Sequence, residues 1–173
     1  VEGGEVKFGT MQAEYGPTAR IVTYTAGFEY TKQMKDFNQS FQVEMLNKAL
    51  GQSYNALLNH IHLSPFINFS YKSANKTAYA GTAEDISWVR LYNTIKNGMK
   101  AAIVAKRTPT VMLASKANQI DIEMALRGGY QINGTNYPAI NGINTIIYYD
   151  GWEETVGKKN YEYKGCPADK IYL

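Results

Sequence analysis

The sequence has little of the chemistry that small enzymes use. It contains one cysteine, Cys166, in 173 residues, which excludes an intrachain disulfide framework and is compatible with a reducing compartment. It contains only two histidines, His60 and His62. On a helix, residues two apart point away from each other, so these two cannot share a metal ion. The sequence therefore predicts no metal site and no cofactor, and it offers Cys166 no neighbouring histidine as an activating base.

The sequence also lacks long runs of one kind of residue. No apolar run approaches the ~20 residues that cross a membrane, so we expect no membrane contact. The net charge is +3, and no basic run is longer than Lys106–Arg107 or Lys158–Lys159. A dedicated nucleic-acid-binding domain is therefore not indicated.

Acidic residues occur in pairs that do not converge by themselves. Glu153 and Glu154 are adjacent, and Asp121 and Glu123 are two apart. The pair Glu84–Asp85 lies where a helix is expected to begin, and carboxylates are favourable there without any catalytic role. The sequence thus predicts no catalytic constellation, and we expect the protein not to be an enzyme.

Aromatic residues are abundant by contrast, because 14 tyrosines raise the aromatic fraction to 13%. Tyrosine combines an apolar ring with a polar tip, so it suits half-buried strands and protein–protein contacts. A chain of 173 residues is long enough to bury a core in one domain or two small ones.

The clearest element is a long amphipathic helix expected from about Asn38 to Leu63, with Pro65 ending it. Its polar residues gather on the opposite side from its apolar ones. The apolar side comprises Val43, Leu46, Leu50, Tyr54, Leu57 and Ile61.

Strand signals precede this helix. Residues from Arg20 to Thr31 alternate between apolar and polar side chains, and Glu5 to Met11 is a second strand candidate. Together they predict a hairpin that runs directly into the helix. Two strands alone are marginally stable, so we expect the hairpin to pack on something else, such as another subunit.

A mixed helix and strand region follows. Thr82 to Asp85 predicts a capping box at the start of a second helix. Thr110 to Ala114 predicts a buried strand, and Ser115 caps a third helix that ends at Gly128–Gly129. The second helix has an apolar side made of Trp88, Leu91, Tyr92, Ile95 and Met99.

The last part of the chain is β-like. Three turn signals, Asn133–Gly134, Asn141–Gly142 and Asp150–Gly151, are typical of hairpins. The apolar run from Ile143 to Tyr149 favours a central strand. The overall expectation is an α+β fold.

The order of these segments resembles the major capsid proteins of tailed phages, which have the Hong Kong 97-like fold. In that family an extended hairpin, the E-loop, returns along a strand into a long spine helix, as expected here over Ala19–Lys35 and Phe41–His62. The later segments Pro109–Leu113 and Cys166–Leu173 resemble the opening of the axial domain and the return to the peripheral domain. The resemblance spans most of the chain by order and pattern.

The resemblance implies four segments. Residues 1–37 would form the E-loop hairpin and returning strand, and residues 38–80 the spine helix and peripheral-domain segment. Residues 81–160 would form a mixed α/β axial domain, and residues 161–173 the strand returning to the peripheral domain. The family's N-terminal arm and the end of its peripheral domain have no counterpart here, so we expect a fragment or processed product.

The implied function is that of a major capsid (head) protein of a tailed bacteriophage or prophage, assembling with itself as hexamers and pentamers into an icosahedral shell. The implied partners are packaged double-stranded DNA, bound without sequence preference, and a scaffold, a portal and a maturation protease. Assembly would take place in the bacterial cytoplasm and the product would be the virion. Candidate inter-subunit contacts are Glu5, Lys7, Phe8, Arg20 and Lys32, with Lys7 also the candidate for the isopeptide cross-link that some members form.

Three alternatives stay open from the sequence. The first is an encapsulin, a shell protein of the same fold that encloses cargo enzymes. The second is a small α/β enzyme, which predicts a pocket with converging groups around Asp121, Glu123 or His60. The third is a monomeric binding module that uses its tyrosine-rich strands.

Overall fold

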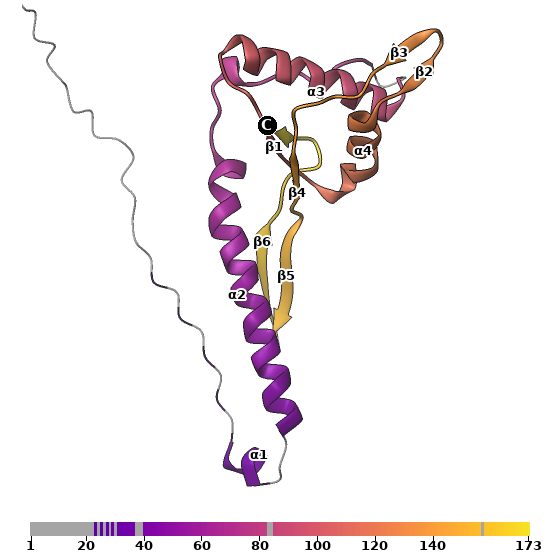
Figure 1. The fold of residues 1–173 in the computed structure, drawn as a ribbon. Helices are drawn as coiled ribbons and strands as arrows, with labels where there is room; N and C mark the ends of the chain where they lie inside the picture. The colour runs from indigo at the N-terminus through magenta and orange to yellow at the C-terminus, as the bar shows by residue number, and fades with distance from the viewer. Residues whose placement is uncertain are drawn as a thin grey trace, which may run out of the picture. The chain divides into compact units, whose positions relative to one another are not determined.

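The computed structural model describes residues 23, 25, 27, 29, 31–36, 40–82, 85–156 and 158–173. The chain divides into two compact units, Val1–Leu46 and Asn47–Leu173. In the first unit the described residues include a short helix, α1 (Lys32–Asp36). The predicted strand Glu5–Met11 and most of Arg20–Thr31 lie outside the described residues. The rest of the chain mixes helix and sheet, which confirms an α+β fold (Figure 1).

The predicted long helix is one continuous element, α2 (Ser40–Asn68). The expectation that Pro65 ends it is wrong, because α2 continues through Pro65 for another three residues. Proline removes one backbone hydrogen bond within a helix but does not forbid the next turn when that turn is held otherwise. Here two tyrosine hydroxyls donate to carbonyls of the last turn, from Tyr71 to Phe66 O at 2.9 Å and from Tyr172 to Ile67 O at 3.2 Å.

After a 3₁₀ turn, η1 (Ser73–Asn75), the next helix is α3 (Ser87–Val104), which begins later than the predicted start at Thr82. The predicted capping box forms only as a separate turn. Asp85 Oδ2 accepts from the Thr82 backbone N–H at 2.6 Å and from its hydroxyl at 3.2 Å. The N-cap of α3 is Ile86, whose side chain cannot cap, so the carboxylate closes the turn that precedes the helix.

A three-stranded sheet lies at the centre of the second unit. It has the order β4–β1–β7, made of β1 (Val111–Ala114), β4 (Thr145–Tyr148) and β7 (Ile171–Tyr172). The predicted strand at Thr110–Ala114 is confirmed, but it is this strand that is central. The run Ile143–Tyr149 contributes an edge strand, paired in parallel with β1.

Strand β1 separates two clusters of buried side chains. Met112 and Ala114 point to one side, where they pack with helices α3 and α4 (Gln119–Arg127). Leu113 points to the other side, where it packs with the end of α2. The predicted apolar side of α3 is confirmed, because it forms most of the first cluster. Its members with less than a tenth of their surface exposed are Trp88, Leu91, Tyr92 and Ile95.

Ser115 accepts a bond from the Ala117 N–H and so caps a 3₁₀ turn, η2 (Lys116–Asn118), that leads into α4. The helix ends at Gly128, as predicted, with a backbone φ of 56°. A side chain at Gly128 would collide with the backbone of Pro138 and Ala139, so this position requires glycine.

Of the three predicted hairpin turns, one forms a hairpin. Asn133 and Gly134 join β2 (Tyr130–Ile132) to β3 (Thr135–Tyr137), with φ values of 47° and 78°. Asn141–Gly142 and Asp150–Gly151 do not close hairpins, because β4 pairs with β1 and β5 (Gly151–Val156) pairs with β6 (Lys159–Lys164). These two glycine turns only redirect the chain.

Candidate functional site

Helix α2 is covered on one side only. Among the described side chains of α2, the least exposed is Ala56, at 8%, although Ala56 is not a member of the predicted apolar side. On the predicted side, Tyr54 is 59% exposed and Ile61 is 39% exposed. The covered side is therefore turned about the helix axis from the one that the sequence pattern indicates.

Two parts of the second unit cover α2. Near the end of the helix, Leu63 and Ile67 pack on the cluster of Leu113, Tyr149 and Cys166. One turn earlier, the ring of His60 stacks on Tyr163 of β6, with 4.6 Å between the ring centroids. Figure 1 shows the β5–β6 hairpin beside α2, as this stacking requires. The hairpin and the sheet therefore occupy one side of α2.

The remaining side carries a row of apolar residues spaced as neighbours on successive helical turns. We call this row the α2 stripe. The stripe comprises Leu50, Tyr54, Leu57, Leu58 and Ile61. Its three leucines are half-buried, and Tyr54 and Ile61 are exposed.

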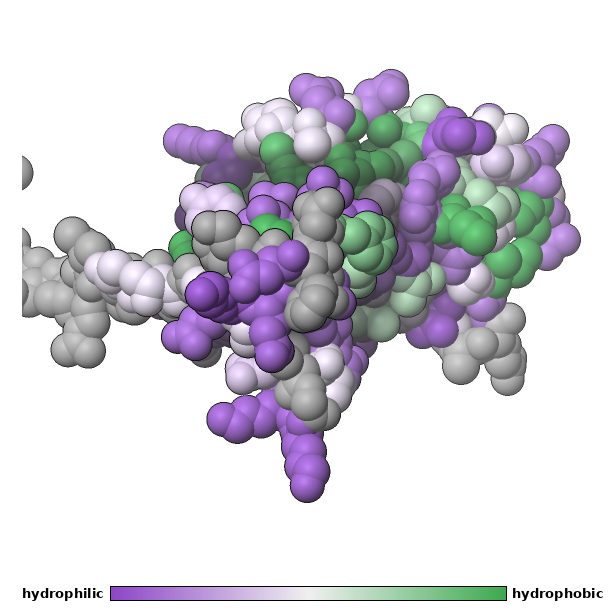
Figure 2. Space-filling view, turned by 90° about the horizontal axis from the view of Figure 1, so that it is seen from below, coloured by the Kyte–Doolittle hydropathy of each residue, from purple (hydrophilic) through white to green (hydrophobic). Residues whose placement is uncertain are grey.

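Further large apolar side chains are exposed, two of them close to the stripe in sequence and one on the hairpin. Phe66 is 59% exposed and Phe69 is 62% exposed, and Tyr161 on the hairpin is 50% exposed. Figure 2 shows residues of high hydropathy, in green, between hydrophilic ones on the face seen from below. Exposed apolar residues that form one contiguous patch mark protein–protein contact surfaces more often than apolar residues scattered singly over the surface.

A hydrogen-bonded group of polar residues lies where the parallel strands β1 and β4 end. Asp150 Oδ1 accepts from the Ser115 hydroxyl at 2.7 Å and from the Lys116 N–H at 2.8 Å. Beside it, the Gly165 backbone passes so close to Asp150 and Gly151 that a side chain at Gly165 would overlap both. This junction joins the sheet to the base of the β5–β6 hairpin.

The junction has the residue types of a catalytic pair but not the arrangement. The Ser115 hydroxyl is buried and donates directly to a carboxylate, with no imidazole between them. A nucleophilic serine needs a base that takes its proton, and a carboxylate is a weak base for this purpose. The bonds instead fix the ends of two strands, so we assign the junction a positioning role.

Cys166 is part of the core. It is 6% exposed, and its sulfur lies 3.8 Å from the carbonyl oxygens of Pro167 and Lys170. Burial is the largest cause that raises the pKa of the thiol to about 11; the charges of Asp150 and Asp169 contribute to the rise, and the charge of Lys170 opposes it. The thiol is therefore protonated at neutral pH and is a poor nucleophile.

Other residues considered for chemistry are separated by the sheet. Glu123 lies on the α3–α4 side of the sheet and accepts a hydrogen bond from Gln119 at 2.9 Å. The pKa of Tyr148 is raised mainly by burial and also by the charge of Glu123. His60 lies on the opposite side, against Tyr163. His62 is exposed, and its Nδ1 lies 2.7 Å from the Leu58 carbonyl oxygen. Among the described residues no three His, Cys, Asp or Glu side chains could hold a metal ion together.

Of the predicted inter-subunit contacts, Glu5, Lys7, Phe8 and Arg20 lie outside the described residues, as does the candidate cross-link at Lys7. Lys32 is the first residue of α1 and is exposed. Neither the Asp150 junction nor the burial of Cys166 was predicted from the sequence. The signal available for the junction was the pair of glycines Gly151 and Gly165, at the start of β5 and after the end of β6.

Comparison with family models, curated proteins and solved structures gave no match. None of the described helices is long and apolar enough to span a membrane. The contact surfaces described above are therefore the grounds on which a function is argued.

Proposed function

We propose that the protein is a structural shell protein, the major capsid protein of a tailed phage or prophage with a Hong Kong 97-like fold. The observation that carries this proposal is the α2 stripe. Tyr54 is 59% exposed in the middle of an uninterrupted helix whose other side is packed against the chain's own sheet and hairpin. An apolar row left open on a rigid element gains stability when another copy covers it.

The arrangement of the described elements is compatible with such a tile. The long helix α2 precedes a small lobe of α3, α4 and the β4–β1–β7 sheet, and the β5–β6 hairpin places Tyr163 against α2. The Asp150 junction and Gly165 fix the lobe to the base of the hairpin. Strong internal positioning of this kind suits a subunit that must keep one shape in every copy of a lattice.

The direct test is assembly. We expect the protein to sediment as large species above a threshold concentration, and negative-stain electron microscopy to show closed shells of uniform diameter. Large interfaces between many copies make such assembly cooperative. A chain that stays monomeric at every concentration, with no particles on the grid, would rule out the shell.

Shells recovered from expressing bacteria also separate a phage capsid from an encapsulin. A capsid is expected to enclose DNA that nuclease reaches only after the shell is disrupted. An encapsulin is expected to enclose a specific protein. Portal and protease genes beside the gene would support the capsid.

Removal of residues 1–18 tests the role expected for the E-loop. If this segment serves neighbouring subunits, the shortened chain keeps most of its melting temperature and loses assembly. If the segment belongs to the subunit's own core, the melting temperature falls with it.

A further inference from the structure

The part of the chain around α3 has an unusual charge. Residues 86–120 contain six basic residues and no aspartate or glutamate. With 15 acids in the whole chain, roughly three would be expected in a stretch of this length. A search for contiguous basic runs does not detect this stretch, because helical spacing rather than adjacency brings its lysines together.

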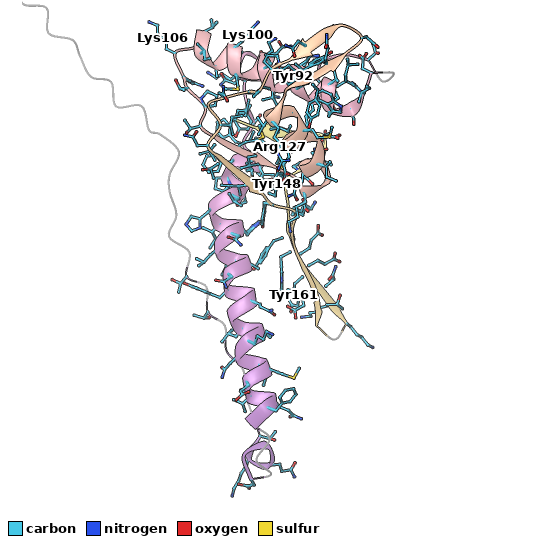
Figure 3. All side chains as sticks on the ribbon, turned by 45° about the vertical axis from the view of Figure 1, so that its right-hand side comes forward. Tyr92, Lys100, Lys106, Arg127, Tyr148 and Tyr161 are labelled. Carbon is cyan, nitrogen blue, oxygen red and sulfur yellow. The ribbon has the colours of Figure 1, made fainter. Side chains whose placement is uncertain are left out.

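Four of these cations are exposed on α3 and the turn that follows it. Lys96 and Lys100 are one helical turn apart, about 6 Å along the axis. Figure 3 shows Lys100 and Lys106 at the outer edge of α3, with Tyr92 on the inner side. We call Lys96, Lys100, Lys106 and Arg107 the α3 basic face.

Within the part of the chain that the structure describes, none of the four side chains of the α3 basic face forms an ion pair. Lys96 has one further contact, with its ammonium 5.8 Å from the centre of the Tyr92 ring. The helix dipole favours cations at the end of α3, but this effect fades within one turn and does not explain Lys96 or the lack of acids.

The backbone at Lys106 supplies an independent observation. The end of α3 has the two hydrogen bonds of a Schellman motif, from Arg107 N to Ala102 O and from Lys106 N to Ile103 O, both at 2.9 Å. The residue after the C-cap in this motif is usually glycine, because its φ is positive. Here it is Lys106, with φ of 58°. The chain thus holds a lysine where glycine would be more stable.

We propose that the α3 basic face binds the phosphate backbone of double-stranded DNA. Unpaired cations without nearby acids attract phosphates and release condensed counterions from DNA when they bind. This deepens the proposed function by naming the face of the subunit that would contact enclosed DNA. The face contains no group arranged to read base edges, so binding is independent of sequence.

Two other anionic partners fit less well. Helices that bind membrane surfaces insert a free apolar side, but the apolar side of α3 is buried in the core and only Ile103 and Val104 are exposed at its end. The acidic residues on the β5–β6 hairpin of a second copy offer little net negative charge to this face. The three glutamates of its β5–β6 hairpin are interleaved with three lysines: Glu153, Glu154 and Glu162 with Lys158, Lys159 and Lys164.

The test measures binding of the unassembled chain to a fluorescent random-sequence DNA duplex by anisotropy at several salt concentrations. With four phosphate contacts, the logarithm of affinity should fall against the logarithm of salt with a slope of roughly −3 to −4. Lys96→Gln with Lys100→Gln should reduce the size of that slope by about 2. The matched control, Lys158→Gln with Lys159→Gln, removes the same charge from the hairpin and should leave the slope unchanged.

Lys106→Gly separates binding from folding. It should reduce the size of the slope by about 1 and raise Tm by roughly 2–4 °C, because glycine tolerates the positive φ. Equal effects of the two lysine pairs, or binding to phosphatidylserine vesicles but not to DNA, would overturn the proposal. If the chain binds DNA but never assembles, the DNA-binding role of this face stands and the proposed shell function fails. If the chain forms shells but has no affinity for DNA, the shell function stands and the DNA-binding role fails.

Discussion

Helices α2 and α3 are the two long helices in the described part of the chain, and they differ in what they bury. Helix α3 places Ile95 at 1% and Tyr92 at 3% exposure in the main core, with polar and basic groups outside. Among the side chains of α2 that the structure describes, only Ala56 is buried to a similar degree, and Tyr54 is largely exposed. Helix α2 is thus a surface element, and α3 holds the core together. A helix can be long and continuous without being the centre of its own subunit.

The largest expected effect comes from breaking the helix that forms the core. Ile95→Ala should cost about 3–4 kcal/mol of unfolding free energy, because it removes a fully buried side chain and leaves a cavity. Tyr54→Ala on α2 should cost less than about 0.5 kcal/mol. Urea denaturation followed by circular dichroism measures both. Similar costs for the two substitutions would contradict the distinction between the helices.

Disrupting the connection between the hairpin and the sheet is expected to have the next largest effect on the free energy of unfolding. Gly165→Ala should cost about 2 kcal/mol, because the added methyl group overlaps the Asp150 backbone. Lys164→Ala, at the neighbouring exposed position, serves as the control. Near-ultraviolet circular dichroism should also lose signal from the Trp152–Tyr163 contact, whose centroids are 5.6 Å apart. Unchanged stability in Gly165→Ala would show that the two backbones can separate freely.

The buried thiol of Cys166, on the side of the sheet that faces α2, should make the stability of the protein depend on pH. The pKa of the thiol is about 11 in the folded protein, against 9.0 for an exposed thiol. Above pH 9 the unfolded chain loses the proton while the folded chain keeps it, so stability falls as pH rises from 9 to 11. Stability is fully present below pH 9. Cys166→Ala should lessen this fall, and identical pH profiles of the two proteins would contradict the burial of the thiol.

The smallest expected effect on stability comes from replacing one glycine in each of the two helices by alanine. Gly51 in α2 has open space where a side chain would lie, so Gly51→Ala should stabilise the protein by about 0.5–1 kcal/mol through helix propensity. At Gly98 in α3 the new methyl group would lie 3.0 Å from Leu173 Cδ1. Gly98→Ala should therefore gain less than Gly51→Ala. Equal gains, measured by thermal melting, would show that α3 is no more closely packed there than α2.

Local patterns in the sequence predicted the elements better than their pairing. The 3.6-residue spacing of Trp88, Leu91 and Ile95 was sufficient to place α3 on the core, because its apolar side is surrounded by the same subunit. The same kind of pattern misplaced the covered side of α2. The periodicity reports which residues are apolar and not which of them the chain itself covers.

Long-range contacts account for the other differences. Three Asn–Gly and Asp–Gly turns have similar local signals, yet only Asn133–Gly134 closes a hairpin, since the parallel pairing of β4 with β1 is decided by residues far apart in the chain. The extension of α2 past Pro65 depends on Tyr172, which is more than a hundred positions away. The Asp150 junction is likewise made by strand ends that meet only in the folded chain.

The central claim is that other copies of the chain cover the α2 stripe. Its most direct test is sedimentation velocity, over a range of concentrations, of the double variant Tyr54→Glu with Ile61→Glu. The matched control is Asn55→Glu with Asn59→Glu, which adds the same charge at exposed positions of α2 that do not belong to the stripe. We predict that the wild type and the control shift to large species with concentration while the stripe variant stays monomeric. A wild type that remains monomeric throughout, or a stripe variant that assembles like the control, would contradict the claim.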